Sequence, residues 1–185
     1  RYRLYTDPIT NVNATSIYTI NRGVHEVDGS HNGPGYLAYT FYLKNNGDLT
    51  INYAYTVNIT SQTMNADQAV WLMFFEDEKQ ITYARMSADG NPEELYGYLT
   101  APFIECALLP EEQYYIEDGK AGVVTTPFID EYTALQGLVQ DFEPGEVKKY
   151  TIVIWCEGDD PECVDAILGG HVGFSIDRKS TRLNS

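Results

Sequence analysis

The chain is poor in basic residues and in long apolar runs. Its 185 residues include 12 Lys and Arg against 27 Asp and Glu, a formal net charge of −15. Nucleic acids and anionic membranes are bound through basic surfaces that neutralise phosphate, so this charge balance argues against both classes of partner. The longest apolar stretch covers only residues 69–75, whereas a membrane helix needs about 18 apolar residues. We therefore expect no membrane span.

Motifs that carry catalysis are also missing. The chain has three histidines, His25, His31 and His171, and no second His follows His25-Glu26 at the spacing of the zinc-binding HExxH helix. No glycine-rich phosphate loop follows a predicted strand, and no serine lies in a G-x-S-x-G turn. We therefore expect a protein that is not an enzyme, with no catalytic residues and no cofactor. A zinc site would require the fold to gather the three histidines.

Short stretches of alternating apolar and polar residues are abundant. Period two over residues 37–44 and 51–60, around Asn45-Asn46-Gly47-Asp48, predicts a hairpin with one face toward the core and one toward solvent. Residues 70–75 and 80–86 predict a second hairpin. Further strands are expected at 103–107, 122–126, 132–142 and 170–176, with a helical turn over 91–97. This pattern favours an all-β fold: an antiparallel, jelly-roll-like β-sandwich with one or two short helical turns.

Residues 150–156 are predicted to form the central strand. They are almost all β-branched or aromatic, which is typical of a strand buried on both faces. An acidic loop over 157–160 follows. Asp160 as N-cap before Pro161 then predicts a short helical turn that ends at Gly169-Gly170.

The chain divides into three parts. Residues 1–35 contain two extended candidates, 2–6 and 15–20, and a turn-rich connector. Residues 36–176 are predicted to form one β-sandwich domain. Residues 177–185 are interpreted as the in-frame translation of a sequencing adapter. A detached strand can pair with another subunit as easily as with its own sheet. The apolar side chains of this candidate donor segment are Tyr2, Leu4, Tyr5, Ile17, Tyr18 and Ile20.

Four segments carry a resemblance that spans nearly the whole chain. Residues 152–170 contain IVIW-C-EGDDPEC-(x)5-GG, and Leu4-Tyr5-Thr6-Asp7 precedes a Thr/Asn-rich run. Residues 36–46 and the turn at 142–146 complete the set. Together they resemble the TasA and camelysin group, secreted proteins of Gram-positive bacteria that carry a SipW-type signal peptide. The resemblance implies that a signal peptide has been removed and that the protein is extracellular, at the cell surface or in a biofilm matrix.

The resemblance also implies a structural function. The chain would be a subunit of an extracellular fibre or biofilm matrix, with copies of itself and other matrix components as partners. The N-terminal strand of one subunit would complete the sheet of the next, and such a non-closing contact propagates into a filament. The alternative is a monomeric cell-surface or carbohydrate-binding module whose strand folds back into its own sheet. A metalloprotease, a class suggested for camelysin-like proteins, lacks supporting residues here.

Two further predictions concern the acidic loop. Three cysteines allow three pairings, of which Cys156 with Cys163 is favoured; Cys106 would then be a buried free thiol, and the alternative is that all three are reduced. Glu157, Asp159, Asp160 and Glu162 are candidate Ca²⁺ ligands, although their spacing does not match an EF-hand. We favour a solvated acidic loop without metal.

Overall fold

The computed structural model describes residues 14–20, 23–98, 114–117 and 120–182. Within these residues every regular element is a strand or a 3-10 turn, and no α-helix occurs. The strands are β1 (Gly29–Ser30), β2 (Tyr36–Lys44), β3 (Ile51–Gln62), β4 (Val70–Glu76), β5 (Lys79–Ala84), β6 (Glu94–Tyr98), β7 (Tyr114–Glu117), β8 (Lys120–Val124), β9 (Thr126–Pro127), β10 (Thr133–Phe142), β11 (Val147–Cys156) and β12 (Val172–Arg182). The 3-10 turns are η1 (Ile17–Thr19), η2 (Val24–Glu26), η3 (Ala66–Gln68) and η5 (Asp165–Ile167).

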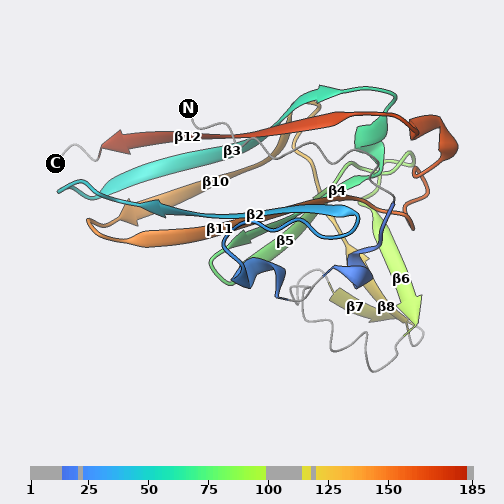
Figure 1. Cartoon of the computed structure of the whole chain (residues 1–185), viewed down its shortest axis with the longest axis horizontal. Coiled ribbons are helices and arrows are strands. Elements are labelled where there is room, and N and C mark those ends of the chain that lie inside the picture. The colour runs from blue at the N-terminus through green and yellow to red at the C-terminus, as the bar shows by residue number, and fades with distance from the viewer. Residues whose placement is uncertain (1–13, 21–22, 99–113, 118–119, 183–185) are drawn as a thin grey trace.

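Two sheets pack face to face as a sandwich (Figure 1). One has six strands in the order β1-β2-β11-β4-β5-β9, and the other has three in the order β10-β3-β12. All neighbours in these sheets are antiparallel except β5 and β9. The core between the layers is aromatic and aliphatic and includes Tyr53, Phe74, Leu135 and Tyr150. The predicted all-β antiparallel sandwich is confirmed.

β11 lies in the middle of the larger sheet, between β2 and β4, as the sequence predicted. Its alternate side chains enter two different cores. Tyr150 and Ile152 face the second sheet, whereas Val153 and Trp155 pack on the opposite side. That opposite side is covered by residues of the N-terminal segment, which explains why both faces of β11 can be apolar.

The predicted hairpin of residues 37–44 with 51–60 is wrong. β2 pairs with β11, and β3 pairs with β10 and β12, so the connection crosses from one sheet to the other. The buried side chain of Asn45 holds this crossover, because its Nδ2 donates to the carbonyls of Leu49 and Phe142, each at 2.9 Å. Even the face of β2 expected toward solvent is partly covered: Ala38 and Thr40 are buried.

Other predicted elements meet the structure in different ways. The β4–β5 hairpin is confirmed, and strands occur at β8, β10 and β12 near the predicted positions. The helical turn over 91–97 is wrong, because this region enters β6. The strand over 15–20 is also wrong, because η1 occupies it. The turn expected after Pro161 forms later, as η5. The predicted strands at 2–6 and 103–107 lie outside the described residues.

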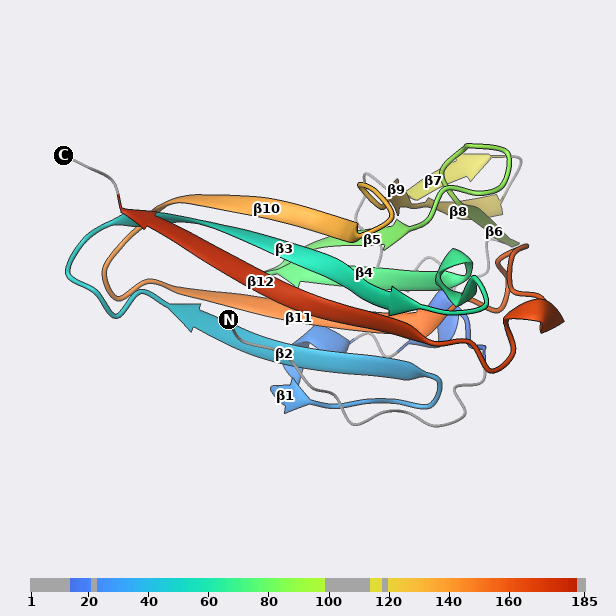
Figure 2. The ribbon, with the colours of Figure 1, turned by 90° about the horizontal axis from the view of Figure 1, so that it is seen from above.

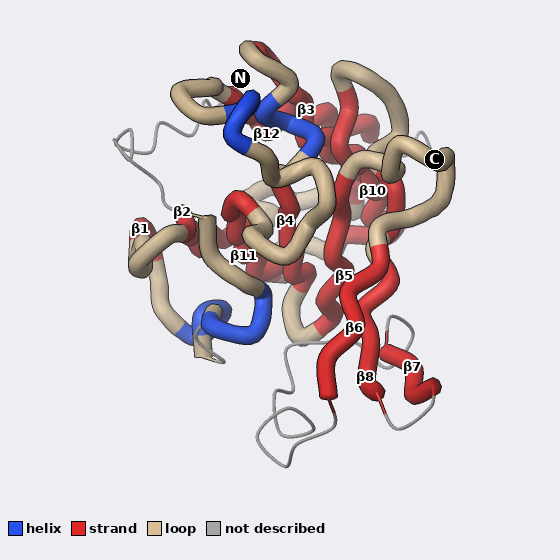
Figure 3. The backbone as a smooth tube through the Cα atoms, turned by 90° about the vertical axis from the view of Figure 1, so that its right-hand side faces the viewer, coloured by secondary structure: helices blue, strands red, loops and turns tan. Residues whose placement is uncertain are grey.

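A small third sheet, β6-β8-β7, projects from one end of the sandwich (Figure 3). β12 continues through Arg182 and pairs with β3 along its length. Residues 177–182 thus extend the last strand of the sandwich. This pairing does not test the interpretation of residues 177–185 as adapter sequence, which stays a prediction. The side chains of residues 178–181 in β12 are exposed.

Candidate functional site

The two sheets of the sandwich have different numbers of strands. As a result, a strip of partly covered apolar side chains lies between β2 and β12 at one side of the sandwich. A jelly roll has eight strands in two Greek keys, which form two facing sheets. Here β2, β11, β4 and β5 form four strands of one layer, but the facing layer has only β10, β3 and β12 among the described residues. Seen from above, β2 lies beyond β12, on the side away from β3 (Figure 2). No described strand of the second sheet therefore lies over β2.

Partial burial marks this strip on both sheets. On β2, the side chains of Tyr39, Phe41 and Leu43 pack against the core but are only partly buried. On β12, the same holds for Phe174 and Ile176. Aromatic and aliphatic side chains that reach a core without being covered by it favour a further strand at this position. Strand β12 is the last one of its sheet in the described chain.

The structure separates the six candidate donor residues. Ile17 and Ile20 are buried in this molecule's own core, with 2% and 3% of their surface exposed, on the outer side of the larger sheet. They do not lie at the strip between β2 and β12. Tyr2, Leu4 and Tyr5 lie outside the described residues, and the side chain of Tyr18 is not described. Ile17 and Ile20 therefore belong to this molecule's own core, and the residues before Ala14 remain the candidate donor segment.

Glu157 fixes this N-terminal segment to the end of β11. Its fully buried carboxylate accepts hydrogen bonds from the backbone N–H of Ile17 at 2.8 Å, from Trp155 Nε1 at 2.9 Å and from the N–H of Asp159 at 3.2 Å. Burial raises the pKa of Glu157 above its usual value, although these three donors favour the charged form. Through these hydrogen bonds Glu157 anchors the N-terminal segment to the end of β11.

Asp160 and Glu162 join a residue that sequence reasoning missed. Their carboxylate oxygens and one from Glu93 all lie within 4.8 Å of one another. Burial, then the charges of Asp160, Glu162 and Asp89, raises the pKa of Glu93 to about 7. Burial also raises the pKa of Asp160 to about 6. Glu93 precedes β6 and stands far from the loop in sequence, so no local signal pointed to it. Neither Glu157 nor Asp159 belongs to this group.

The two cysteines of the loop are neighbours in space. The Sγ atoms of Cys156 and Cys163 lie 3.7 Å apart, and both residues are free thiols in this structure. Burial, then the neighbouring Cys163, raises the pKa of the Cys156 thiol to about 12, which makes it a poor nucleophile at neutral pH. The predicted pairing is geometrically close, and the disulfide itself stays a prediction. Cys106 lies outside the described residues.

The three histidines do not converge on a metal site. His25 lies 3.5 Å from Glu78 and stacks on Phe75, His31 contacts the backbone carbonyls of Gly29 and Val24, and His171 contacts Ser61. In the described part of the chain, the one group of potential metal ligands contains carboxylates alone.

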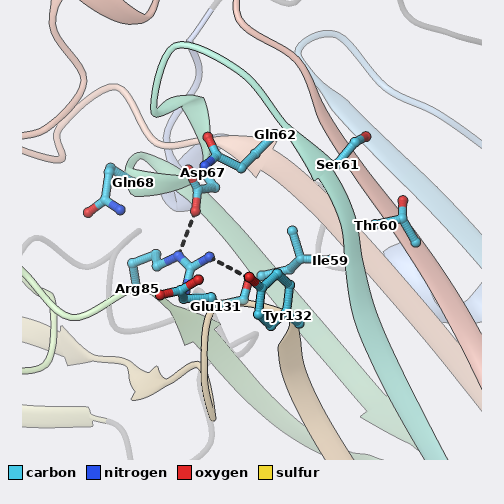
Figure 4. A pocket seen from close by; sticks show the side chains of 9 residues that line it. All are labelled: Ile59, Thr60, Ser61, Gln62, Asp67, Gln68, Arg85, Glu131 and Tyr132. Atoms are coloured by element: carbon cyan, nitrogen blue, oxygen red, sulfur yellow. Dashed lines mark hydrogen bonds and ion pairs between the residues drawn. The ribbon is translucent and has the colours of Figure 1, made fainter.

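A surface pocket beside η3 is occupied by its own charges (Figure 4). Arg85 Nε donates to Asp67 Oδ2 at 2.7 Å, and its other nitrogens donate to the carbonyls of Asp130 and Glu131, each at 2.9 Å. Because the guanidinium of Arg85 is hydrogen-bonded to all three partners, we interpret the pocket as a structural contact that joins η3, β5 and the loop before β10.

Comparisons with known proteins add no relative. No family model matches the chain, and no curated protein matches it significantly. Among the described residues, no helix has the length and apolar character of a membrane span.

Proposed function

We propose that this protein is a secreted, non-enzymatic structural subunit of an extracellular fibre or biofilm matrix, assembled by donation of an N-terminal strand to the next copy. The observation that carries the proposal is that no described strand of the three-stranded sheet lies over β2, and that Tyr39, Phe41 and Phe174 are only partly buried beside this position. An extended segment placed there would add backbone hydrogen bonds to the sheet and cover apolar surface.

The residues before Ala14 supply a suitable occupant. Residues 1–4, RYRL, alternate basic with apolar side chains at strand spacing, and Tyr5 adds a further apolar side chain. Arg1 and Arg3 carry positive charge into a chain whose net charge is −15, which would speed the encounter with another copy at low salt while contributing little to affinity. The resemblance to the TasA and camelysin group gives the same mechanism. In an oxidising extracellular environment, the thiols of Cys156 and Cys163 would close from 3.7 Å to a disulfide of about 2.05 Å.

The first test removes residues 1–13 and keeps Ala14 onward, so that Ile17 and Ile20 still complete the core. The truncated protein is expected to fold, to stay monomeric in analytical ultracentrifugation and to form no filaments by negative-stain microscopy. A synthetic peptide of residues 1–13 is expected to bind it in a one-to-one complex. Filaments that form without these residues contradict the proposal.

A matched pair of substitutions tests the mode of docking. Residues 3 and 4 point to opposite faces of an extended strand. Leu4→Ser is expected to slow or abolish filament growth, whereas Arg3→Ser leaves it within about threefold, because a rim charge contributes little at moderate salt. Full-length protein that stays monomeric at every concentration rejects the fibre and supports the monomeric surface module.

A further inference from the structure

The carboxylates of Glu93, Asp160 and Glu162 meet where two loops approach each other. Glu93 ends the loop between β5 and β6, and the other two lie in the loop after β11. The loops are also joined directly, because the backbone N–H of Ala88 donates to Glu162 Oε1 at 3.0 Å. The three groups gather negative charge, and none of them takes part in an ion pair formed by the described residues.

Two oxygens of this cluster lack any partner. Only 3% of the surface of Glu93 is exposed, and its Oε1 is shielded from solvent and makes no hydrogen bond. Glu162 Oε2 is likewise shielded and unsatisfied. Burying a charged oxygen without a partner is costly, so proteins normally place a donor or a cation beside it. Here one carboxylate oxygen from each of the three residues lies within 4.8 Å of the other two.

Asp160 is held in place by donors that leave room for a further ligand. Trp71 Nε1 donates to its Oδ2 at 2.7 Å, and the backbone N–H of Glu162 donates to its Oδ1 at 2.9 Å. Each carboxylate oxygen keeps a second lone pair. The Asp160 carboxylate is therefore oriented toward the cluster by a buried indole, as the outer partners of metal ligands commonly do.

We propose that Glu93, Asp160 and Glu162 form a binding site for one divalent cation, and that the ion is Ca²⁺. Hard carboxylate oxygens suit Ca²⁺, whose ligands lie at about 2.3–2.6 Å in flexible geometry, so oxygens on opposite sides of the ion are about 5 Å apart. A group within 4.8 Å fits that spacing. Backbone carbonyls or water would complete the coordination. The bound ion would tie the base of the small third sheet to the end of β11, in a monomer as well as in a fibre.

The binding test uses Tb³⁺ as a luminescent substitute for Ca²⁺ on the full chain after treatment with a chelator. Trp71 touches a ligand, so its excitation is expected to sensitise Tb³⁺ emission, and Ca²⁺ is expected to quench that emission by displacement. Glu93→Gln keeps the side-chain shape and removes one charged ligand, and is expected to weaken binding about tenfold or more. Glu143→Gln, an exposed carboxylate at the opposite end of β11, is the matched control and is expected to bind like the natural sequence.

Thermal unfolding separates this site from general charge screening. In chelator, Glu93→Gln is expected to melt higher than the natural sequence, because a buried unpaired charge is gone. In Ca²⁺ the order is expected to reverse, because only the natural sequence gains from the ion. If Glu93→Gln does not fold, Glu162→Gln replaces it. Two outcomes overturn the proposal. If Ca²⁺ shifts the melting temperature of all variants equally, the effect is general charge screening. If Glu93→Gln is stabilising but no Tb³⁺ emission is seen, the carboxyl groups share a proton and bind no ion.

Discussion

At the scale of single residues, Arg85 and Asp67 form the most buried ion pair among the described residues, with side chains 15% and 3% exposed. We expect Arg85→Met to lower the free energy of unfolding by about 3–5 kcal/mol, because Asp67 then stays buried with no opposite charge. Chemical denaturation followed by tryptophan fluorescence measures this loss. Methionine keeps an apolar stem near the ring of Phe128, which the guanidinium now covers at 5.6 Å.

The double variant Arg85→Met with Asp67→Asn is the control for this prediction. It removes the stranded charge and is expected to recover a large part of the loss. A single-variant effect below about 1 kcal/mol would show instead that solvent screens the pair as it does a surface ion pair.

Residue-level prediction was only partly right even where the signal was local. Asp160 was expected to cap a helical turn that starts at Pro161. Its carboxylate does accept the N–H of Glu162, but the helical turn forms later, as η5. Glu93 was missed, because its partners come from the loop after β11 and only the fold brings them together. Arg85 and Asp67 were missed for the same reason.

At the scale of elements, the β4–β5 turn is fastened to β11 through Asp77. Its Oδ1 accepts the N–H of Lys149 and its Oδ2 accepts Lys148 Nζ, each at 2.9 Å. Asp77→Ala is expected to cost about 1–2 kcal/mol in urea unfolding at neutral pH. Asp77→Asn keeps an acceptor and tolerates the positive φ of 53°. It should cost less than about 1 kcal/mol, because only the half-exposed ion pair is lost.

The same contacts predict a pH dependence. Burial opposes the charged form of Asp77, but the Lys149 amide and the Lys148 ammonium outweigh it and lower its pKa. The unfolded chain therefore takes up this proton first as pH falls, so the stabilisation is complete above about pH 4 and disappears as pH falls through the lowered folded pKa. Unfolding midpoints of the natural sequence and Asp77→Asn should converge in acid. A gap that persists there contradicts the assignment.

Element-level prediction worked for β11 and failed for the partner of β2. Apolar side chains on both faces of residues 150–156 identify a central strand, since only such a strand is covered twice. Alternation over residues 37–44 and 51–60 identifies two strands but not what they pair with. The buried amide of Asn45, which bonds to Phe142 far along the chain, directs the crossover. The local alternation of apolar and polar residues does not indicate this contact, because its two partners are far apart in the sequence.

At the scale of the whole molecule, the N-terminal segment has two separable parts. Residues from Ala14 belong to the molecule's own outer core, through Ile17 and the carboxylate of Glu157. The residues before Ala14 are the candidates for donation. Sequence reasoning joined both parts into one donor, because Ile17 and Ile20 are as apolar as Leu4 and composition does not show which surface they cover.

Ile17→Ala tests this division. As a core residue with 2% exposure, Ile17 should contribute to the stability of a single chain, and its truncation is expected to cost about 2–5 kcal/mol. The loss should be the same at every protein concentration, because folding within one chain does not depend on mass action. Ile129→Ala, a half-exposed isoleucine, is the matched control and should cost well below that. If the cost of Ile17→Ala grows with concentration while the dilute protein is unaffected, Ile17 belongs to the interface between copies, and the donor segment extends past Ala14 after all.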